Sequence, residues 1–162
     1  MALEVVNPFT NKKVKELAEY TDYNILTAIS NGNEAYKSWG KTSFQDRAFL
    51  MKKAAALLEE NKISYAKIIT EEMGKTTREA IAEIEKCALV CNHYANHTAI
   101  YLEDEKVKLG DKEAIICYEP LGIIFAIMPW NFPFWQVFRF AAPTLMAGNG
   151  ALLKHASNVP QC

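Results

Sequence analysis

The feature that most constrains the fold of this chain is a continuous apolar run, Leu121 to Met128, that ends at a proline. Runs of this kind are typical of strands that are covered on both faces in a parallel sheet. Pro129 cannot donate a ladder hydrogen bond and therefore stops the strand, and Pro133 suits the first turn of a helix. The sequence thus predicts that Asn131 lies in a strand-to-helix turn.

The residues after this turn predict a helix and then a second buried strand. Gly148-Asn149-Gly150 ends the helix, because these residues tolerate the left-handed conformation that helix ends favour. The short apolar segment Ala151 to Leu153 follows and leads into Lys154, so the whole unit is βαβ. The helix itself is indicated by apolar residues at spacings of three and four, namely Phe134, Val137, Phe138, Ala141, Ala142, Leu145 and Met146.

The position of Asn131 makes it a candidate site residue. In open α/β sheets, ligands bind at the carboxyl ends of the strands. The alternative interpretation is a tight turn in which the Asn131 side chain only satisfies local backbone groups.

These segments resemble the aldehyde dehydrogenase superfamily, whose members carry a Pro-Trp-Asn-Phe-Pro turn, a helix, an Ala-Gly segment and a strand that ends in Lys. Arg139 and Lys154-His155-Ala156 are most similar to the succinate-semialdehyde dehydrogenase branch. The resemblance extends over essentially the whole chain through three further segments, Asn7-Pro8-Phe9-Thr10, Ala54 to Asn61 and Glu72-Met73-Gly74-Lys75.

The resemblance implies NAD(P)-dependent oxidation of an aldehyde, in this branch succinate semialdehyde to succinate. In the family a cysteine thiolate attacks the aldehyde to give a thiohemiacetal, hydride passes to NAD or NADP, and water hydrolyses the thioester. By resemblance Asn131 is the oxyanion donor, a task that suits a carboxamide because it donates without titrating.

The resemblance also implies a cofactor site. Lys154 would hold the adenosine ribose, although a lysine at a strand end can also simply extend to solvent. NAD-strict members often carry a glutamate three residues after this lysine, whereas this chain has Ser157, so we expect NADP to be accepted alongside NAD. The backbone expected to lie along the cofactor is that of Ile127, Met128, Pro129 and Trp130.

Arg139 bears on substrate choice. In the resembled branch the matching arginine contacts the substrate carboxylate, which a guanidinium binds with two parallel hydrogen bonds. The alternative is a surface or interdomain ion pair.

Several parts of such an enzyme are missing. The chain contains no Gly-x-Gly-x-x-Gly fingerprint. The resemblance implies that the phosphate-binding helix, the nucleophilic cysteine and the glutamate base lie beyond residue 162. Cys162 is not a candidate nucleophile, because it follows Lys154 by only eight residues, in the stretch that resembles the family's loop after the cofactor lysine. We therefore expect an N-terminal fragment, truncated relative to the family and inactive alone. The other interpretation is a non-catalytic helical binding or interaction protein that reuses the fold, but such a module needs neither Asn131 nor Lys154.

Composition narrows the class of protein. With 162 residues, half of them hydrophobic, and a net charge of −1, the chain is typical of a globular protein without an electrostatic footprint for nucleic acid or an anionic membrane. No apolar stretch reaches transmembrane length and the N-terminus is not a secretory signal, so we expect a cytoplasmic protein whose partner is a small aldehyde.

Four cysteines suggest reduced thiols rather than a disulfide scaffold. Cys87 and Cys91 lie one helical turn apart, which allows either a zinc site with His93 and His97 or a buried stripe. The histidines point away from the cysteine stripe at about 100° per residue, so we favour the buried stripe and expect no metal.

We expect residues 1–118 to form a helical N-terminal part with a β-hairpin at about 106–118, and residues 119–162 to begin a Rossmann-like coenzyme-binding domain of aldehyde dehydrogenase type. In the resembled family the strands that correspond to this hairpin form an arm used in subunit contacts. The resemblance therefore implies a homo-oligomer. Trp39 and its helical stripe, Met73 and Tyr94 are expected in the core. Caps and stops predict four helices: from Thr21-Asp22 to Gly40, from Ser43 to Asn61, a third ending at Gly74, and a long one from a Thr76 and Glu79 capping box to about Tyr101.

Overall fold

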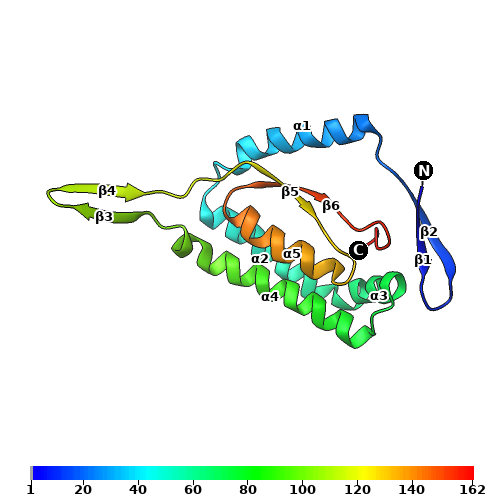
Figure 1. Cartoon of the computed structure of the whole chain (residues 1–162). Helices are drawn as coiled ribbons and strands as arrows, with labels where there is room; N and C mark the ends of the chain where they lie inside the picture. The colour runs from blue at the N-terminus through cyan, green and yellow to red at the C-terminus, as the bar shows by residue number, and fades with distance from the viewer. Residues whose placement is uncertain (1) are drawn as a thin grey trace.

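The computed structural model describes residues 2–162, which form five helices and three two-stranded sheets (Figure 1). No helix within these residues is both long and apolar enough to cross a bilayer. In chain order the elements are β1 (Ala2–Asn7), β2 (Lys12–Ala18), α1 (Asp22–Trp39), α2 (Phe44–Glu60), α3 (Lys62–Met73), α4 (Thr77–Tyr101), β3 (Glu105–Leu109), β4 (Lys112–Ile116), β5 (Ile123–Ile127), α5 (Pro133–Met146) and β6 (Gly150–Lys154).

The predicted βαβ unit is confirmed. Strands β5 and β6 pair in parallel from Ile123 with Gly150 to Ile127 with Lys154, and α5 connects them. Figure 1 shows the pair between α1 on one side and α5 on the other, and both helices contact β6. The first strand is shorter than the apolar run, because the N–H groups of Leu121 and Gly122 donate to the Asn149 side chain instead of to a neighbouring strand.

The prediction that this strand is covered on both faces is wrong for part of β5. Phe125 is 62% and Ile127 is 68% exposed. They share a face with Ile123, which lies against Gly32 of α1, so the start of this face is covered while Phe125 and Ile127 stay exposed. An apolar surface therefore remains open at the end of the sheet that carries the candidate site.

Helices α2, α3, α4 and α5 enclose the main hydrophobic core, in which α4 packs against each of the other three. Cys87 and Cys91 are fully buried there, which confirms the buried cysteine stripe, and Met73 and Tyr94 pack against its edge. Each fully buried Ile or Met side chain contributes about 1.5–3 kcal/mol relative to an exposed one. The largest such core side chains are Ile69, Ile84 and Met146.

The stripe on α1 is buried only in part. Trp39 donates from its indole Nε1 to the Leu145 carbonyl at 3.0 Å, so the C-terminal end of the stripe is held against α5. Ile25 and Ile29 are 47% and 46% exposed, which contradicts the expectation of a continuous core stripe. The reason is that α1 packs on the sheet through the later residues Gly32 and Tyr36.

The first strand pair, β1 and β2, is a correction to the predicted helical N-terminus. The two strands are antiparallel with a bulge between Val5 and Val6, and Asn7 closes the turn by accepting from the N–H groups of Phe9 and Thr10. Most of this ribbon is solvent-exposed, so neither strand needs an apolar face. The alternation of apolar and polar residues that usually identifies a strand is therefore missing from the sequence.

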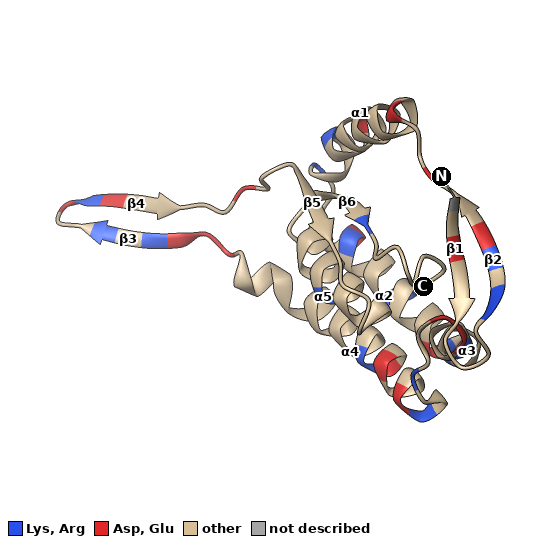
Figure 2. Cartoon of the chain, turned by 45° about the vertical axis from the view of Figure 1, so that its right-hand side comes forward, with Lys and Arg blue, Asp and Glu red and all other residues tan. Residues whose placement is uncertain are grey.

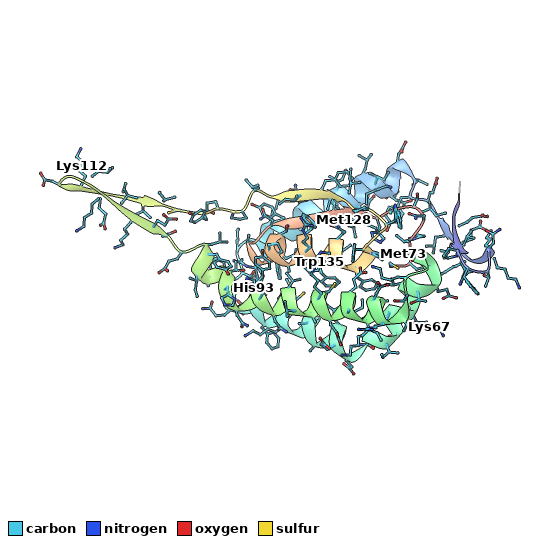
Figure 3. The ribbon with its side chains drawn as sticks, turned by 60° about the horizontal axis from the view of Figure 1, so that its bottom comes forward. Lys67, Met73, His93, Lys112, Met128 and Trp135 are labelled. Atoms are coloured by element: carbon cyan, nitrogen blue, oxygen red, sulfur yellow. The ribbon has the colours of Figure 1, made fainter. Side chains whose placement is uncertain are left out.

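The second hairpin, β3 and β4, confirms the predicted one, with strands at 105–116 rather than 106–118. It projects away from the rest of the molecule as a narrow arm, with Lys112 at its tip (Figures 1 and 3). Charges of both signs lie along the arm (Figure 2). Gly110 forms the turn with a φ of 64°, a left-handed conformation that glycine adopts without a Cβ penalty.

Candidate active site

Asn131 lies in the turn between β5 and α5, as the sequence predicted. Pro133 is the first residue of α5, and the N-cap residue Phe132 provides no side-chain cap. The Asn131 side chain is exposed, and its carboxamide makes no hydrogen bond within residues 2–162. The alternative of a turn asparagine that satisfies local backbone groups therefore has no support here, and the amide is free to bind a ligand.

Glu83 of α4 caps the N-terminus of α5. Its Oε1 accepts hydrogen bonds from the backbone N–H groups of Phe134 at 2.9 Å and Trp135 at 3.0 Å. These groups are among the four that every helix leaves without an internal partner, and a carboxylate at this end also interacts favourably with the helix dipole. Glu83 is only 4% exposed, so the cap belongs to the protein interior.

Lys75 links this carboxylate to Asn131. Its Nζ forms an ion pair with Oε2 of Glu83 and donates to the backbone carbonyl of Asn131 at 3.1 Å. The same Nζ lies 3.9 Å from the centre of the Phe132 ring. The ion pair is thus buried beneath the turn that carries the candidate oxyanion donor.

Sequence reasoning missed the roles of both residues of this pair. In the sequence, Lys75 stands out only as part of a segment that resembles the family. A signal for Glu83 was available, because it shares the helical face of Ala80, Ile84 and Cys87, where a carboxylate is out of place unless it has partners.

Glu72 makes a second cap of the same kind, on the segment after β6. Its carboxylate accepts from the N–H of Gln161 at 2.9 Å and from the N–H of Cys162 at 2.9 Å. Burial raises the pKa of the Cys162 thiol, so this thiol stays protonated and is a poor nucleophile. The structure thus supports the exclusion of Cys162 as the nucleophile.

The carboxyl ends of β5 and β6 bring the predicted cofactor residues together. Ile127 and Lys154 are paired in the parallel register, and the N–H of Met128 donates to the Lys154 carbonyl at 3.1 Å. Pro129, Trp130 and Lys154 are exposed beside them. Ser157, also exposed, follows in the turn after β6.

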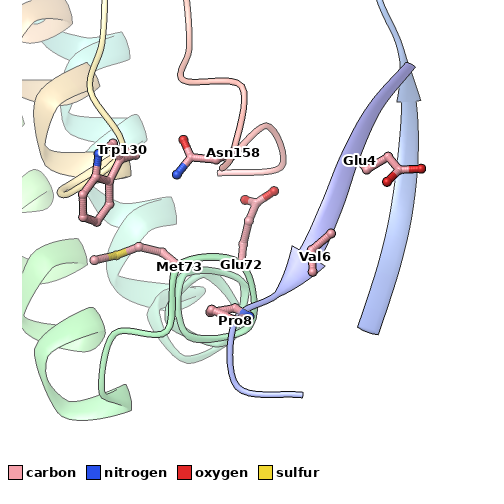
Figure 4. A pocket seen from close by; sticks show the side chains of 7 residues that line it. All are labelled: Glu4, Val6, Pro8, Glu72, Met73, Trp130 and Asn158. Atoms are coloured by element: carbon pink, nitrogen blue, oxygen red, sulfur yellow. The ribbon is translucent and has the colours of Figure 1, made fainter. Parts of the chain in front are cut away.

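A cavity of about 280 Å³ lies next to these strand ends rather than at Asn131 or Lys154. Figure 4 shows Trp130 and Asn158 on one side of it and β1 on the other. Its walls also include Glu72 and Met73 at the end of α3, and Glu4, Val6 and Pro8 complete them. The N-terminal ribbon therefore closes the space beside the loops that follow both strands.

Comparison with known proteins assigns the family. The model of the aldehyde dehydrogenase family matches residues 1–162. The chain belongs to this family. Among its relatives, a probable succinate-semialdehyde dehydrogenase [NADP(+)] of Synechocystis sp. is 48% identical over all of this chain and 36% of its own length. Succinate-semialdehyde dehydrogenase [NADP(+)] 1 of Mycobacterium tuberculosis is 46% identical over the same shares.

Two solved structures superimpose on nearly the whole chain. The structure of Gox0499 matches with a TM-score of 0.97 at 35% identity, over 100% of this chain and 36% of that one. Succinic semialdehyde dehydrogenase from Streptococcus pyogenes, solved with NADP+, matches with a TM-score of 0.95 at 30% identity, over 99% and 35%. This aldehyde dehydrogenase chain thus spans about a third of the length of the curated relatives it matches.

Arg139 of this family member lies on an exposed position of α5. No carboxylate within residues 2–162 forms an ion pair with it, so a salt bridge inside this part of the chain is not its role. The guanidinium is accessible from the side of α5 that faces solvent.

The cysteines and histidines of α4 do not converge. Cys87 and Cys91 are buried in the core, whereas His93 and His97 stack on each other at a centroid distance of 4.6 Å on the outer side of the helix. His93 also contacts Tyr101, whose hydroxyl lies 3.1 Å from His93 Nε2. No group of three potential metal ligands is present in the part of the chain that the structure describes.

Proposed function

We propose that this chain is the N-terminal part of an NAD(P)-dependent aldehyde dehydrogenase that oxidises succinate semialdehyde to succinate. The observation that carries the proposal is the free Asn131 carboxamide, held at the start of α5 next to the joined ends of β5 and β6. The similarity to enzymes named succinate-semialdehyde dehydrogenase supports the choice of substrate.

Asn131 is the proposed oxyanion donor. When a thiolate adds to the aldehyde carbon, negative charge develops on the carbonyl oxygen, and a preorganised N–H donor stabilises it by about 2.7–4 kcal/mol. The carboxamide meets this requirement because it is neutral, accessible and not engaged in a local hydrogen bond.

The strand ends fit one part of a dinucleotide. Ile127 is exposed beside the Lys154 side chain, so an apolar surface and a cation lie together at the edge of the sheet. Lys154 would donate to the ribose, Ser157 would leave room for a 2′-phosphate, and Ile127, Met128, Pro129 and Trp130 would line the cofactor. The bound cofactor supplies the hydride acceptor.

Arg139 is the proposed contact for the distal carboxylate of the substrate. It is exposed and has no ion-pair partner within the described residues, so its guanidinium is available for a bidentate contact. The interdomain ion pair considered above remains the competing role.

The chain itself does not supply the nucleophile. Cys87 and Cys91 are buried in the core, and burial raises the pKa of Cys91 to about 11. Cys117 is exposed at the base of the arm, away from Asn131, and its pKa is also raised. We therefore propose that the attacking thiolate and its base belong to the complete enzyme, that residues 1–162 alone are inactive, and that the β3–β4 arm contributes to a homo-oligomer. A helical interaction module would use neither Asn131 nor Lys154.

The test is an assay of the complete enzyme that carries this chain as its N-terminal part. NAD(P)H formation is followed with succinate semialdehyde and with butanal, an uncharged aldehyde of the same carbon number. Oxidation of succinate semialdehyde with a higher kcat/KM than butanal supports the proposal. Absence of turnover with every aldehyde and both cofactors refutes it.

A further inference from the structure

We propose that the buried ion pair of Lys75 and Glu83 is a positioning device for Asn131. This inference rests on the proposed function, because it assigns the pair to the orientation of the proposed oxyanion donor. Lys75 and Glu83 do not contact the reacting atoms in this account. They act through the backbone of the turn that carries the donor.

The pair holds both ends of a short segment. At one end Lys75 Nζ donates to the Asn131 carbonyl at 3.1 Å, and at the other Glu83 Oε1 accepts from the N–H groups of Phe134 and Trp135. The ion pair joins the two anchors. The turn is therefore fixed on both sides of Pro133 by two side chains that contact each other.

The ion pair of Lys75 and Glu83 is buried and therefore holds the turn rigidly, unlike an ion pair at the surface. The Lys75 side chain is 8% and the Glu83 side chain 1% exposed. Breaking a buried ion pair leaves a buried charge without compensation. Moving either side chain away from its partner therefore costs a large free energy. Phe132 covers Lys75 at 3.9 Å and adds a cation–π contact from the turn itself.

This arrangement matters because the Asn131 side chain has no local anchor. Its carboxamide makes no hydrogen bond within residues 2–162, so its position follows from the backbone to which it is attached. A displacement of about 1 Å in a catalytic group can cost about 100-fold in rate. A contact that fixes the Asn131 backbone carbonyl thus controls the placement of the carboxamide on the same residue.

The test is a double-mutant cycle in the complete enzyme, with kcat and KM measured for Lys75→Met, Glu83→Gln, Asn131→Ala and the Lys75→Met/Asn131→Ala pair. Glu83→Gln retains an acceptor for the α5 cap but removes the charge that holds Lys75. Each single variant leaves one buried charge without a partner, which could disturb folding. The Lys75→Met/Glu83→Gln variant removes both charges and so excludes that explanation for a loss of kcat. Lys75→Arg serves as the conservative rescue.

Lys62→Met is the matched control. Lys62 pairs with Glu85, two residues along α4 from Glu83, at 2.6 Å, but this pair is partly exposed and does not touch the turn. Its loss should leave kcat unchanged. Thermal unfolding of every variant is recorded so that loss of structure is separated from loss of placement.

We expect Lys75→Met and Glu83→Gln to lower kcat about tenfold or more, with KM values that change less than about threefold, because only placement in the transition state is lost. In the Asn131→Ala background Lys75→Met should have almost no further effect on kcat. If Lys75→Met lowered kcat by the same factor in the unsubstituted enzyme and in Asn131→Ala, or left kcat unchanged, the positioning role would be overturned. The proposed function would still stand in that case. An unsubstituted enzyme without aldehyde turnover would instead overturn the proposed function and the inference with it.

Discussion

The backbone N–H of Met128 donates to the Lys154 carbonyl at 3.1 Å, one residue beyond the last paired position of β5. This bond ties the segment before Asn131 to the end of β6. The Lys154 side chain lies on the same face of the sheet as that of Ile127, because directly paired residues of parallel strands point to the same side. A cation and an apolar strand end therefore form one surface.

Lys154→Ala in the complete enzyme should raise the KM for the cofactor about tenfold or more, since one charge-assisted hydrogen bond is worth about 1.5–3 kcal/mol. The KM for the aldehyde should change little. Steady-state kinetics with the cofactor varied provides the measurement, and Lys67→Ala on the exposed face of α3 is the control. An unchanged cofactor KM would show that Lys154 only extends to solvent.

Ser157→Glu should convert an enzyme that uses both cofactors into one that prefers NAD. The introduced carboxylate would repel the 2′-phosphate of NADP, so kcat/KM for NADP should fall about tenfold or more while the value for NAD is retained. Ser157→Gln introduces a side chain of nearly the same size as Glu but without its charge. It should leave the ratio of kcat/KM for NADP to kcat/KM for NAD close to that of the unsubstituted enzyme. If no NADP turnover is detectable before substitution, the prediction of NADP use is wrong.

Arg139→Ala should raise the KM for succinate semialdehyde much more than the KM for butanal. The reason is that only the first substrate offers a carboxylate to the guanidinium. Arg139→Lys keeps the charge but loses the two-point geometry, so it should recover only part of the difference. Equal effects on both aldehydes would assign Arg139 to an ion pair elsewhere in the enzyme.

Residues 1–162 expressed alone should form no NAD(P)H and should self-associate. Within residues 2–162 strand β5 has one partner, β6, and exposes Phe125 and Ile127, so an apolar edge and face stay open. Replacing both residues by Thr, which keeps strand propensity, should raise the monomer fraction measured by light scattering. Phe9→Thr, in the turn of the N-terminal ribbon, is the control. A monodisperse unsubstituted monomer would contradict this prediction.

Local signals in the sequence account for much of the helical and βαβ structure. Thr21 and Ser43 cap their helices as predicted, and Gly74 ends α3 with a φ of 81°. The capping box at Thr76 is incomplete: Glu79 N–H donates to the Thr76 hydroxyl, but the Glu79 carboxylate accepts from that hydroxyl instead of from the backbone. Caps depend on residues three positions apart, and for that reason they can be recognised in the sequence.

Contacts between distant residues were not predictable in the same way. Glu83 is about 50 residues from the N–H groups that it caps, and Glu72 about 90 from those of Gln161 and Cys162. Periodicity identifies such carboxylates only as charges on an apolar helix face and does not identify their partners. The β1–β2 ribbon was missed for a different reason, because an exposed two-stranded sheet needs no apolar alternation.

The central claim is that Asn131 donates to the oxyanion formed in aldehyde oxidation. The most direct measurement is kcat for Asn131→Ala in the complete enzyme, with the KM for NADP measured in parallel. Loss of one oxyanion donor should lower kcat by about 100- to 1,000-fold and leave cofactor binding unchanged. A variant that keeps the kcat of the unsubstituted enzyme would contradict the claim.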